Sequence, residues 1–175
     1  MHQGEHGFTL AELMVGLAIV AILGVIASPA LGGLLTTFQA SNTPRQVAAT
    51  LHAARLKAIS RHTNYKVTFY QAESDQCCPS RPDQSPRCAG SYQLYRYSAG
   101  VWVCDGKAVR LPSTVKFRDS DPTTFTNDEV VFTTTGVLTS IMPGTVYLTG
   151  RTNQQQYRIT VLGLTGRIKV WKGWR

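Results

Sequence analysis

Residues 8–38 read FTLAELMVGLAIVAILGVIASPALGGLLTTF, and this stretch decides the fold class of the chain. It contains a single charged residue, Glu12. A helix needs roughly 20 mostly apolar residues to cross a bilayer, so the stretch is long enough to span one. A cleaved secretory signal has a shorter apolar run and a basic start, whereas residues 1–7, MHQGEHG, contain no lysine or arginine. The sequence therefore predicts a helix that stays in the membrane.

Glu12 is an unusual residue for an ordinary membrane anchor. A carboxylate five residues into an apolar segment is costly in hydrocarbon, which indicates a specific partner. The alternative is that Glu12 lies at the membrane interface, where the dipole at the start of a helix favours a negative charge. The charge alone leaves both interpretations open.

The residues around Glu12, Gly7-Phe8-Thr9-Leu10-Ala11-Glu12-Leu13, resemble the cleavage and methylation site of type IV prepilins and pseudopilins. The resemblance implies that prepilin peptidase removes a leader, residues 1–7, by cutting between Gly7 and Phe8, and then methylates Phe8. It also implies that Glu12 pairs with the terminal amine of a neighbouring subunit, which would relieve two charges that are expensive in hydrocarbon. We expect a single-pass inner-membrane precursor with its C-terminal domain in the periplasm, which then enters the pilus and reaches the cell surface.

Residues 8–62 are predicted to form one long helix with interruptions. Pro29, followed by two glycines, predicts a bend or local melting. Residues 41–44, Ser-Asn-Thr-Pro, predict a break and a restart, with Thr43 as the N-cap and Pro44 at the first helical position.

The two parts of this helix have different patterns. Residues 8–38 are expected to form the membrane or filament core. In residues 44–62, apolar side chains recur at helical spacing and basic residues occupy the other faces. This amphipathic part is expected to pack on a globular domain.

Residues 63–175 are predicted to form that domain from β-strands, ending in a basic C-terminal strand. Short runs rich in Val, Ile, Tyr, Phe and Thr are separated by turn-rich pieces. The predicted strands are Tyr65–Tyr70, Tyr92–Tyr97, Val101–Val103, Lys107–Leu111, Val115–Arg118, Val130–Thr133, Thr145–Thr149, Tyr157–Val161 and Arg167–Trp171. Three Thr-Gly pairs, at residues 135–136, 149–150 and 165–166, predict hairpin turns. A long helix followed only by strands indicates the α+β class.

The strand order and two segments, residues 131–136 (Val-Phe-Thr-Thr-Thr-Gly) and Gly166-Arg167-Ile168, resemble the GspH/FimT branch of the pilin superfamily. The resemblance covers essentially the whole chain. It implies a β-sandwich of two small antiparallel sheets packed against the helix. It also implies a minor pilin of a type IV pilus or a minor pseudopilin of type II secretion. The implied partners are other major and minor pilins or pseudopilins, prepilin peptidase and the inner membrane.

The sequence carries no pattern that is typical of an enzyme. It contains no GxSxG, HExxH, Walker or dinucleotide-binding signature. His52 and His62 project from the predicted helix roughly 80° apart, so they do not converge. Asp119 and Asp121 flank a serine in a predicted loop, where a solvated turn is expected. We predict a protein without catalytic residues, metal or cofactor.

Four cysteines, Cys77, Cys78, Cys88 and Cys104, lie in the part of the chain that is expected to be exported, where oxidation is favoured. Because adjacent cysteines rarely bond each other, we predict disulfides 77–88 with 78–104, or 78–88 with 77–104. The alternative is a zinc site, which no CxxC spacing or nearby histidine supports. The disulfides would cross-link the polar loop Pro79–Pro86.

Positive charge is concentrated towards the C-terminus. The chain has 18 Lys and Arg against 10 Asp and Glu, a net charge of +8, and the last acidic residue is Glu129. In residues 167–171, alternation places Ile168 and Val170 towards the core and the two cations and the indole on the other face. The candidate DNA-binding residues are Arg158, Gly166, Arg167, Lys169, Trp171, Lys172 and Arg175.

Two functions remain for this basic end. Cations that contact phosphates beside an indole that stacks on a base or sugar are typical of non-specific binding to double-stranded DNA. FimT-like members of the family bind DNA for natural transformation and carry the sequence Gly-Arg-x-Arg. Here the corresponding segment, residues 166–169, ends in lysine. Lysine keeps the positive charge but loses the bidentate contact that arginine makes with a phosphate. The alternative is a structural subunit that helps initiate or cap a filament, with charges that protect an edge strand from aggregation and a Trp171 that packs on a neighbour.

Overall fold

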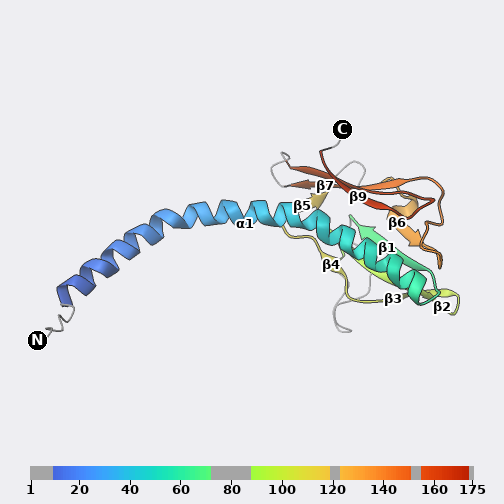
Figure 1. Ribbon diagram of the computed structural model, residues 1–175, viewed down its shortest axis with the longest axis horizontal. Helices are drawn as coiled ribbons and strands as arrows, with labels where there is room; N and C mark the ends of the chain where they lie inside the picture. The colour runs from blue at the N-terminus through green and yellow to red at the C-terminus, as the bar shows by residue number, and fades with distance from the viewer. Residues whose placement is uncertain (1–9, 72–87, 119–122, 151–154, 174–175) are drawn as a thin grey trace, which may run out of the picture. The chain divides into compact units, whose positions relative to one another are not determined.

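The computed structural model describes residues 10–71, 88–118, 123–150 and 155–173 of the 175-residue chain. The chain divides into two compact units, Met1–Phe38 and Gln39–Arg175. Figure 1 traces it from the helix in blue to the C-terminal strands in red. The first unit contains the beginning of the helix, and the second contains the rest of the helix and the strands.

Helix α1 spans Leu10–Ser60. Its large apolar side chains between Leu10 and Val25 are exposed, by 77% and 75% at these two ends, and so long an apolar surface is typical of a segment that meets lipid or other subunits. Within the described residues, no helix combines the length and the apolarity that crossing a bilayer requires. The local melting predicted near Pro29 is not observed, because the backbone stays helical there.

The predicted break at residues 41–44 is wrong, because α1 continues through it. Thr43 is not an N-cap. Its Oγ1 donates a hydrogen bond to the carbonyl oxygen of Gln39 at 2.7 Å, as threonine does within a helix. Thr43 and Pro44 are both buried. Packing of this helix face outweighs the backbone hydrogen bond that Pro44 cannot donate.

The strands form two antiparallel sheets. The first sheet has five strands in the order β3-β2-β1-β6, with β4 also paired to β2; their bounds are β1 Tyr65–Tyr70, β2 Ser91–Ser98, β3 Val101–Cys104, β4 Val109–Arg110 and β6 Glu129–Phe132. The second sheet has the order β5-β7-β8-β9; its strands are β5 Val115–Phe117, β7 Gly144–Gly150, β8 Gln156–Val161 and β9 Ile168–Lys172. A 3₁₀ turn, η1, covers Thr126–Asp128 before β6.

One hydrophobic core joins the two sheets and the second part of α1. The helix contributes a stripe of buried residues at helical spacing, and both sheets contribute the inward residues of their strands. The stripe comprises Val47, Leu51, Ala54 and Ala58, all without exposed surface. The α+β class, with a helix packed on antiparallel sheets, is therefore confirmed.

Each predicted strand has a counterpart in the structure. The largest change is in the segment predicted at Lys107–Leu111, which is reduced to β4, Val109–Arg110. Of the three Thr-Gly pairs, Gly136 and Gly166 lie in turns with positive φ, whereas Gly150 is the last residue of β7.

Candidate nucleic-acid interface

The outer face of the second sheet carries a row of alternating cationic and aromatic side chains. Along β7 and β8, buried core residues flank Tyr147 and Arg158, so these two side chains face outward. The strand register pairs Tyr147 with Arg158, and Arg158 with Trp171. On the other side of β7, the backbone N–H of Arg118, just after β5, donates a hydrogen bond of 3.2 Å to the carbonyl oxygen of Tyr147. Arg118, Tyr147, Arg158 and Trp171 therefore lie in one line across the sheet, which we call the transverse row.

Cations lie over both aromatic rings of the transverse row. The Cζ of Arg118 lies 5.3 Å from the ring centroid of Tyr147. The Cζ of Arg158 and the Nζ of Lys169 lie 5.3 and 5.4 Å from the ring centroid of Trp171. Attraction between a cation and an aromatic ring acts within about 6 Å. The rings therefore help to hold these cations at fixed places on the sheet.

Arg158 is partly enclosed by this arrangement. Its Nε is buried and has no hydrogen-bond partner among the described residues. A buried donor without a partner lowers stability by roughly 1–3 kcal/mol. Such a cost points to a role for the guanidinium other than folding.

The four strands that form this face contain cations but no Asp or Glu. The three ion pairs found in the described part of the chain join Lys57 and Arg61 to Asp105, and Lys66 to Glu129. Within the same residues, Arg158, Arg167 and Lys169 therefore form no ion pair. Clustered charges of one sign attract a polyanionic partner.

The structure brings several of the predicted DNA-binding residues to this face. Ile168 packs against the core, so alternation puts Arg167, just before β9, on the same side as Lys169 and Trp171. Arg167 is exposed, and the exposed fraction of Trp171 is 44%. The next line across the sheet contains Thr145, Thr160 and Lys169. The hydroxyl groups of the two threonines are hydrogen-bonded at 3.2 Å.

Two predicted positions differ from the expectation, and a third is not described by the structure. Val170 lies opposite the buried Ile159 but is 41% exposed, because β9 is an edge strand. Lys172 is the last residue of β9 and lies opposite Tyr157, so it points away from the transverse row. Arg175 lies outside the described residues.

Gly166 has a packing role that the sequence pattern did not show. Its φ is +59°, and a Cβ built there would lie 2.1 Å from the carbonyl oxygen of Gly136. The same oxygen accepts a hydrogen bond of 2.9 Å from the Nε of Arg55 on α1. Gly166 thus lets two turns and the helix meet, immediately before Arg167.

The sequence interpretation missed Arg118 and Tyr147 as members of this face. The signal was available in part, because both lie in predicted strands with alternating apolar residues. Their position beside Arg158 depends on the strand register, which the alternation does not reveal.

The described residues include only some of the predicted N-terminal sites and cysteines. Gly7 and Phe8 lie outside the described residues, and Glu12 lies in the first turn of α1. Cys88 and Cys104 are each in a disulfide. Cys77 and Cys78 lie outside the described residues, so the predicted pairings stay predictions. Among the residues that the structure describes, no cluster of His, Cys, Asp or Glu could hold a metal ion.

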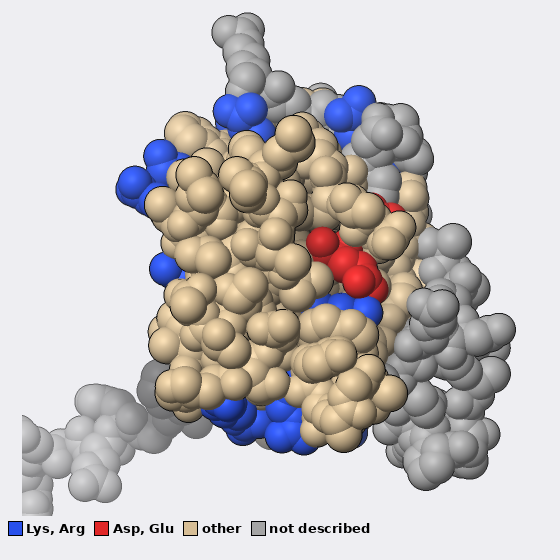
Figure 2. Space-filling view, turned by 90° about the vertical axis from the view of Figure 1, so that its right-hand side faces the viewer, with Lys and Arg blue, Asp and Glu red and all other residues tan. Residues whose placement is uncertain are grey.

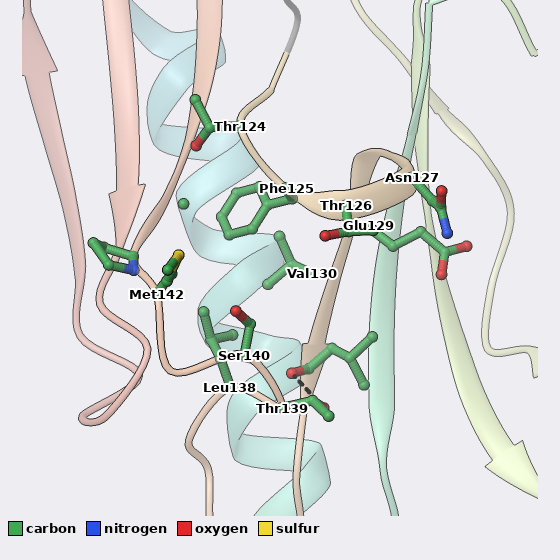
Figure 3. A pocket seen from close by; sticks show the side chains of 13 residues that line it. Thr124, Phe125, Thr126, Asn127, Glu129, Val130, Leu138, Thr139, Ser140 and Met142 are labelled. Carbon is green, nitrogen blue, oxygen red and sulfur yellow. Dashed lines mark hydrogen bonds between the residues drawn. The ribbon is translucent and has the colours of Figure 1, made fainter.

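A groove of about 400 Å³ lies elsewhere in the second unit, beside η1 and the segment before β7. Figure 3 shows the threonine, serine and apolar side chains that line it, with Phe125 and Met142 among them. Figure 2 shows the molecule turned by 90° from Figure 1, with lysine and arginine mainly around the rim of the visible face. The groove contains no concentration of charge comparable with the second sheet.

Comparison with known proteins identifies the family. The model of the family described as type II transport protein GspH matches residues 44–165. The chain belongs to the GspH family. A second model, the prokaryotic N-terminal methylation motif, matches residues 3–28 of this GspH-family chain. The two matches make it a minor pilin or minor pseudopilin of a type IV pilus or a type II secretion system.

Solved structures share the fold of the GspH-family chain. The minor pseudopilin EpsH of the type 2 secretion system of Vibrio cholerae is 12% identical, with a TM-score of 0.53 over 77% of this chain and 97% of EpsH. The type IV minor pilin FimU of Pseudomonas aeruginosa is 16% identical, with a TM-score of 0.52 over 75% of this chain and 87% of FimU. Among curated proteins, none matches the sequence significantly. At these identities the likeness concerns the fold.

Proposed function

We propose that this GspH-family chain is a minor type IV pilin that binds DNA without sequence preference and serves DNA uptake in natural transformation. The observation that carries the proposal is the outer face of the second sheet. Arg158, Arg167 and Lys169 share this face, and the strands around them contain no acidic residue. A surface of this kind suits the evenly spaced phosphates of a nucleic acid.

The proposal includes the route by which the subunit reaches the filament. Prepilin peptidase cuts between Gly7 and Phe8 and methylates Phe8. The precursor lies in the inner membrane with its second unit in the periplasm. Glu12 then pairs with the terminal amine of a neighbouring pilin, because neither charge is tolerated alone in an apolar filament core. The methylation motif over residues 3–28 supports this route.

DNA binding is tested with the full-length chain in detergent micelles and a fluorescent duplex at several salt concentrations. We expect weak binding that falls steeply with salt. The double variant Arg167→Gln/Lys169→Gln should bind more weakly and lower the slope of log K against log salt by roughly 1.8, about 0.9 for each lost phosphate contact.

A matched control removes two exposed cations from the first sheet region. Lys107→Gln/Arg110→Gln changes the net charge equally, and both residues are exposed. This variant should bind like the wild-type chain. Equal losses in the two double variants would mean that net charge alone attracts the duplex, and the proposed site would be wrong.

A structural subunit is the second candidate, in a pilus or in type II secretion. The family match to type II transport protein GspH favours it, as does the exposed edge strand β9, which could meet a neighbouring subunit. In that case, neither the wild-type chain nor any variant should bind the duplex in low salt. The chain should then still be required for filament assembly or secretion.

A further inference from the structure

The transverse row reaches beyond the C-terminal strand. Its four members come from β9, β8, β7 and the residue after β5, so the row crosses the entire second sheet. Neighbouring strands lie about 4.8 Å apart, which makes the row about 14 Å long. Arg118 and Tyr147, at the far end, belong to none of the motifs discussed above.

We propose that the nucleic-acid interface extends along the whole transverse row, with Arg118 as its second end, and that the row grips the sugar–phosphate backbone of duplex DNA. This inference rests on the proposed function, since it extends the same interface. The rings of Tyr147 and Trp171 then act as supports for cations. They are not platforms for unstacked bases.

The positions of the cations carry this assignment. Three cations lie between 5.3 and 5.4 Å from a ring centroid of the row. A base that stacked on Tyr147 or Trp171 would compete with a cation for the space over the ring. Single-stranded nucleic acids are bound largely by such stacking. A surface whose rings already carry cations is therefore better suited to phosphates.

The length of the row also suits a duplex. The major groove is about 12 Å wide and is bordered by phosphates of both strands. Arg118 at one end of the row and Lys169, which lies over Trp171 at the other end, can meet both borders at once. Cations of β9 alone would follow only one of them. The arginines suit this role, because a guanidinium donates to phosphate oxygens in a fixed fork.

The first arm of the test asks whether Arg118 contributes. Arg118→Gln in the full-length chain in micelles should bind a duplex several-fold more weakly and lower the salt slope by about 0.9. Arg118→Lys, which keeps the charge, should retain the wild-type slope. Arg110→Gln, an exposed arginine of β4 in the first sheet, is the matched control and should bind like wild type. Melting temperatures of all the variants verify that they are folded.

The second arm separates phosphate binding from stacking. Trp171→Leu should weaken binding to duplex and single-stranded DNA of equal length by similar factors, because it releases two cations in both cases. A loss confined to single strands would show that the ring stacks on bases, and would overturn the inference.

The outcomes distinguish the two proposals. If Arg118→Gln binds as wild type while Arg167→Gln/Lys169→Gln does not, the interface does not reach Arg118 and the inference is wrong, although the proposed function stands. If the wild-type chain binds neither form of DNA, the proposed function itself is wrong.

Discussion

At the scale of single residues, Asp105 shows how charges hold the second unit together. Its carboxylate accepts a hydrogen bond of 2.8 Å from the Nζ of Lys57, and the Nη1 of Arg61 lies 3.7 Å away. Lys57 lies in the last turn of α1, and Arg61 directly follows its last residue, Ser60. Partial burial acts to raise the pKa of Asp105, but the hydrogen bond and the charges of Lys57 and Arg61 outweigh it and lower the pKa.

This lowered pKa predicts a pH-dependent contribution to stability. A carboxyl group whose pKa is lower in the folded chain stabilises it fully above the unfolded pKa, about 3.9, and loses this effect as pH falls through the folded value. Asp105→Asn should therefore reduce the free energy of unfolding at neutral pH by roughly 0.5–1 kcal/mol, since the pair is partly exposed. Urea unfolding of both chains between neutral and acid pH measures this. A difference that stays constant down to pH 2 would contradict the assignment.

Glu12 provides the second prediction at this scale. Glu12→Ala should leave cleavage of the leader intact, because the residue lies beyond the cut. It should reduce incorporation into filaments, since the Phe8 ammonium loses its partner in an apolar surrounding. Quantitative mass spectrometry of sheared filaments and of membranes measures both effects. Wild-type amounts of the variant in sheared filaments would indicate that Glu12 is merely an interfacial residue.

At the scale of elements, the packing of α1 on two turns sets the start of β9. The Nε of Arg55 on α1 donates a hydrogen bond to the carbonyl oxygen of Gly136. The same oxygen leaves no room for a side chain at Gly166. The left-handed backbone at Gly166 is also disfavoured for residues with a Cβ. The glycine before Arg167 is thus required by packing, whatever the basic strand binds.

This packing predicts a strong effect of Gly166→Ala. The left-handed backbone should reduce the free energy of unfolding by roughly 1–2 kcal/mol, and the contact with Gly136 should add about 1–3 kcal/mol. Gly90→Ala is the matched control, because Gly90 has a similar φ of +68° with no atom within 4 Å of a built Cβ. Urea unfolding should separate the two variants. Equal losses would show that the turns move apart without cost.

The elements also show what the sequence could and could not reveal. Alternation located the strands, and β8 shows it in the structure: Tyr157, Ile159 and Val161 are buried, and the residues between them are partly exposed. The pairing of Arg158 with Tyr147 and Trp171 could not be predicted, because it depends on the registers of two hairpins. The break predicted at Thr43 failed because local propensity was outweighed by burial in the core.

At the scale of the whole molecule, the charge pattern and the apolar helix divide the tasks of the chain. The apolar surface between Leu10 and Val25 suits a membrane and then a filament core. The excess of positive charge, +8 in total, includes Arg158 and Lys169 of the second sheet. We therefore propose that the helix serves assembly and that the second sheet binds DNA. Assembly is the central claim, since DNA uptake requires a subunit that reaches the filament.

Intact-mass analysis of the chain recovered from sheared filaments tests this claim most directly. Prepilin processing predicts a mature chain that begins at Phe8, carries one added methyl group at its N-terminus and lacks residues 1–7. A chain that begins at any other residue, or that is found only uncut in the membrane, would contradict the account.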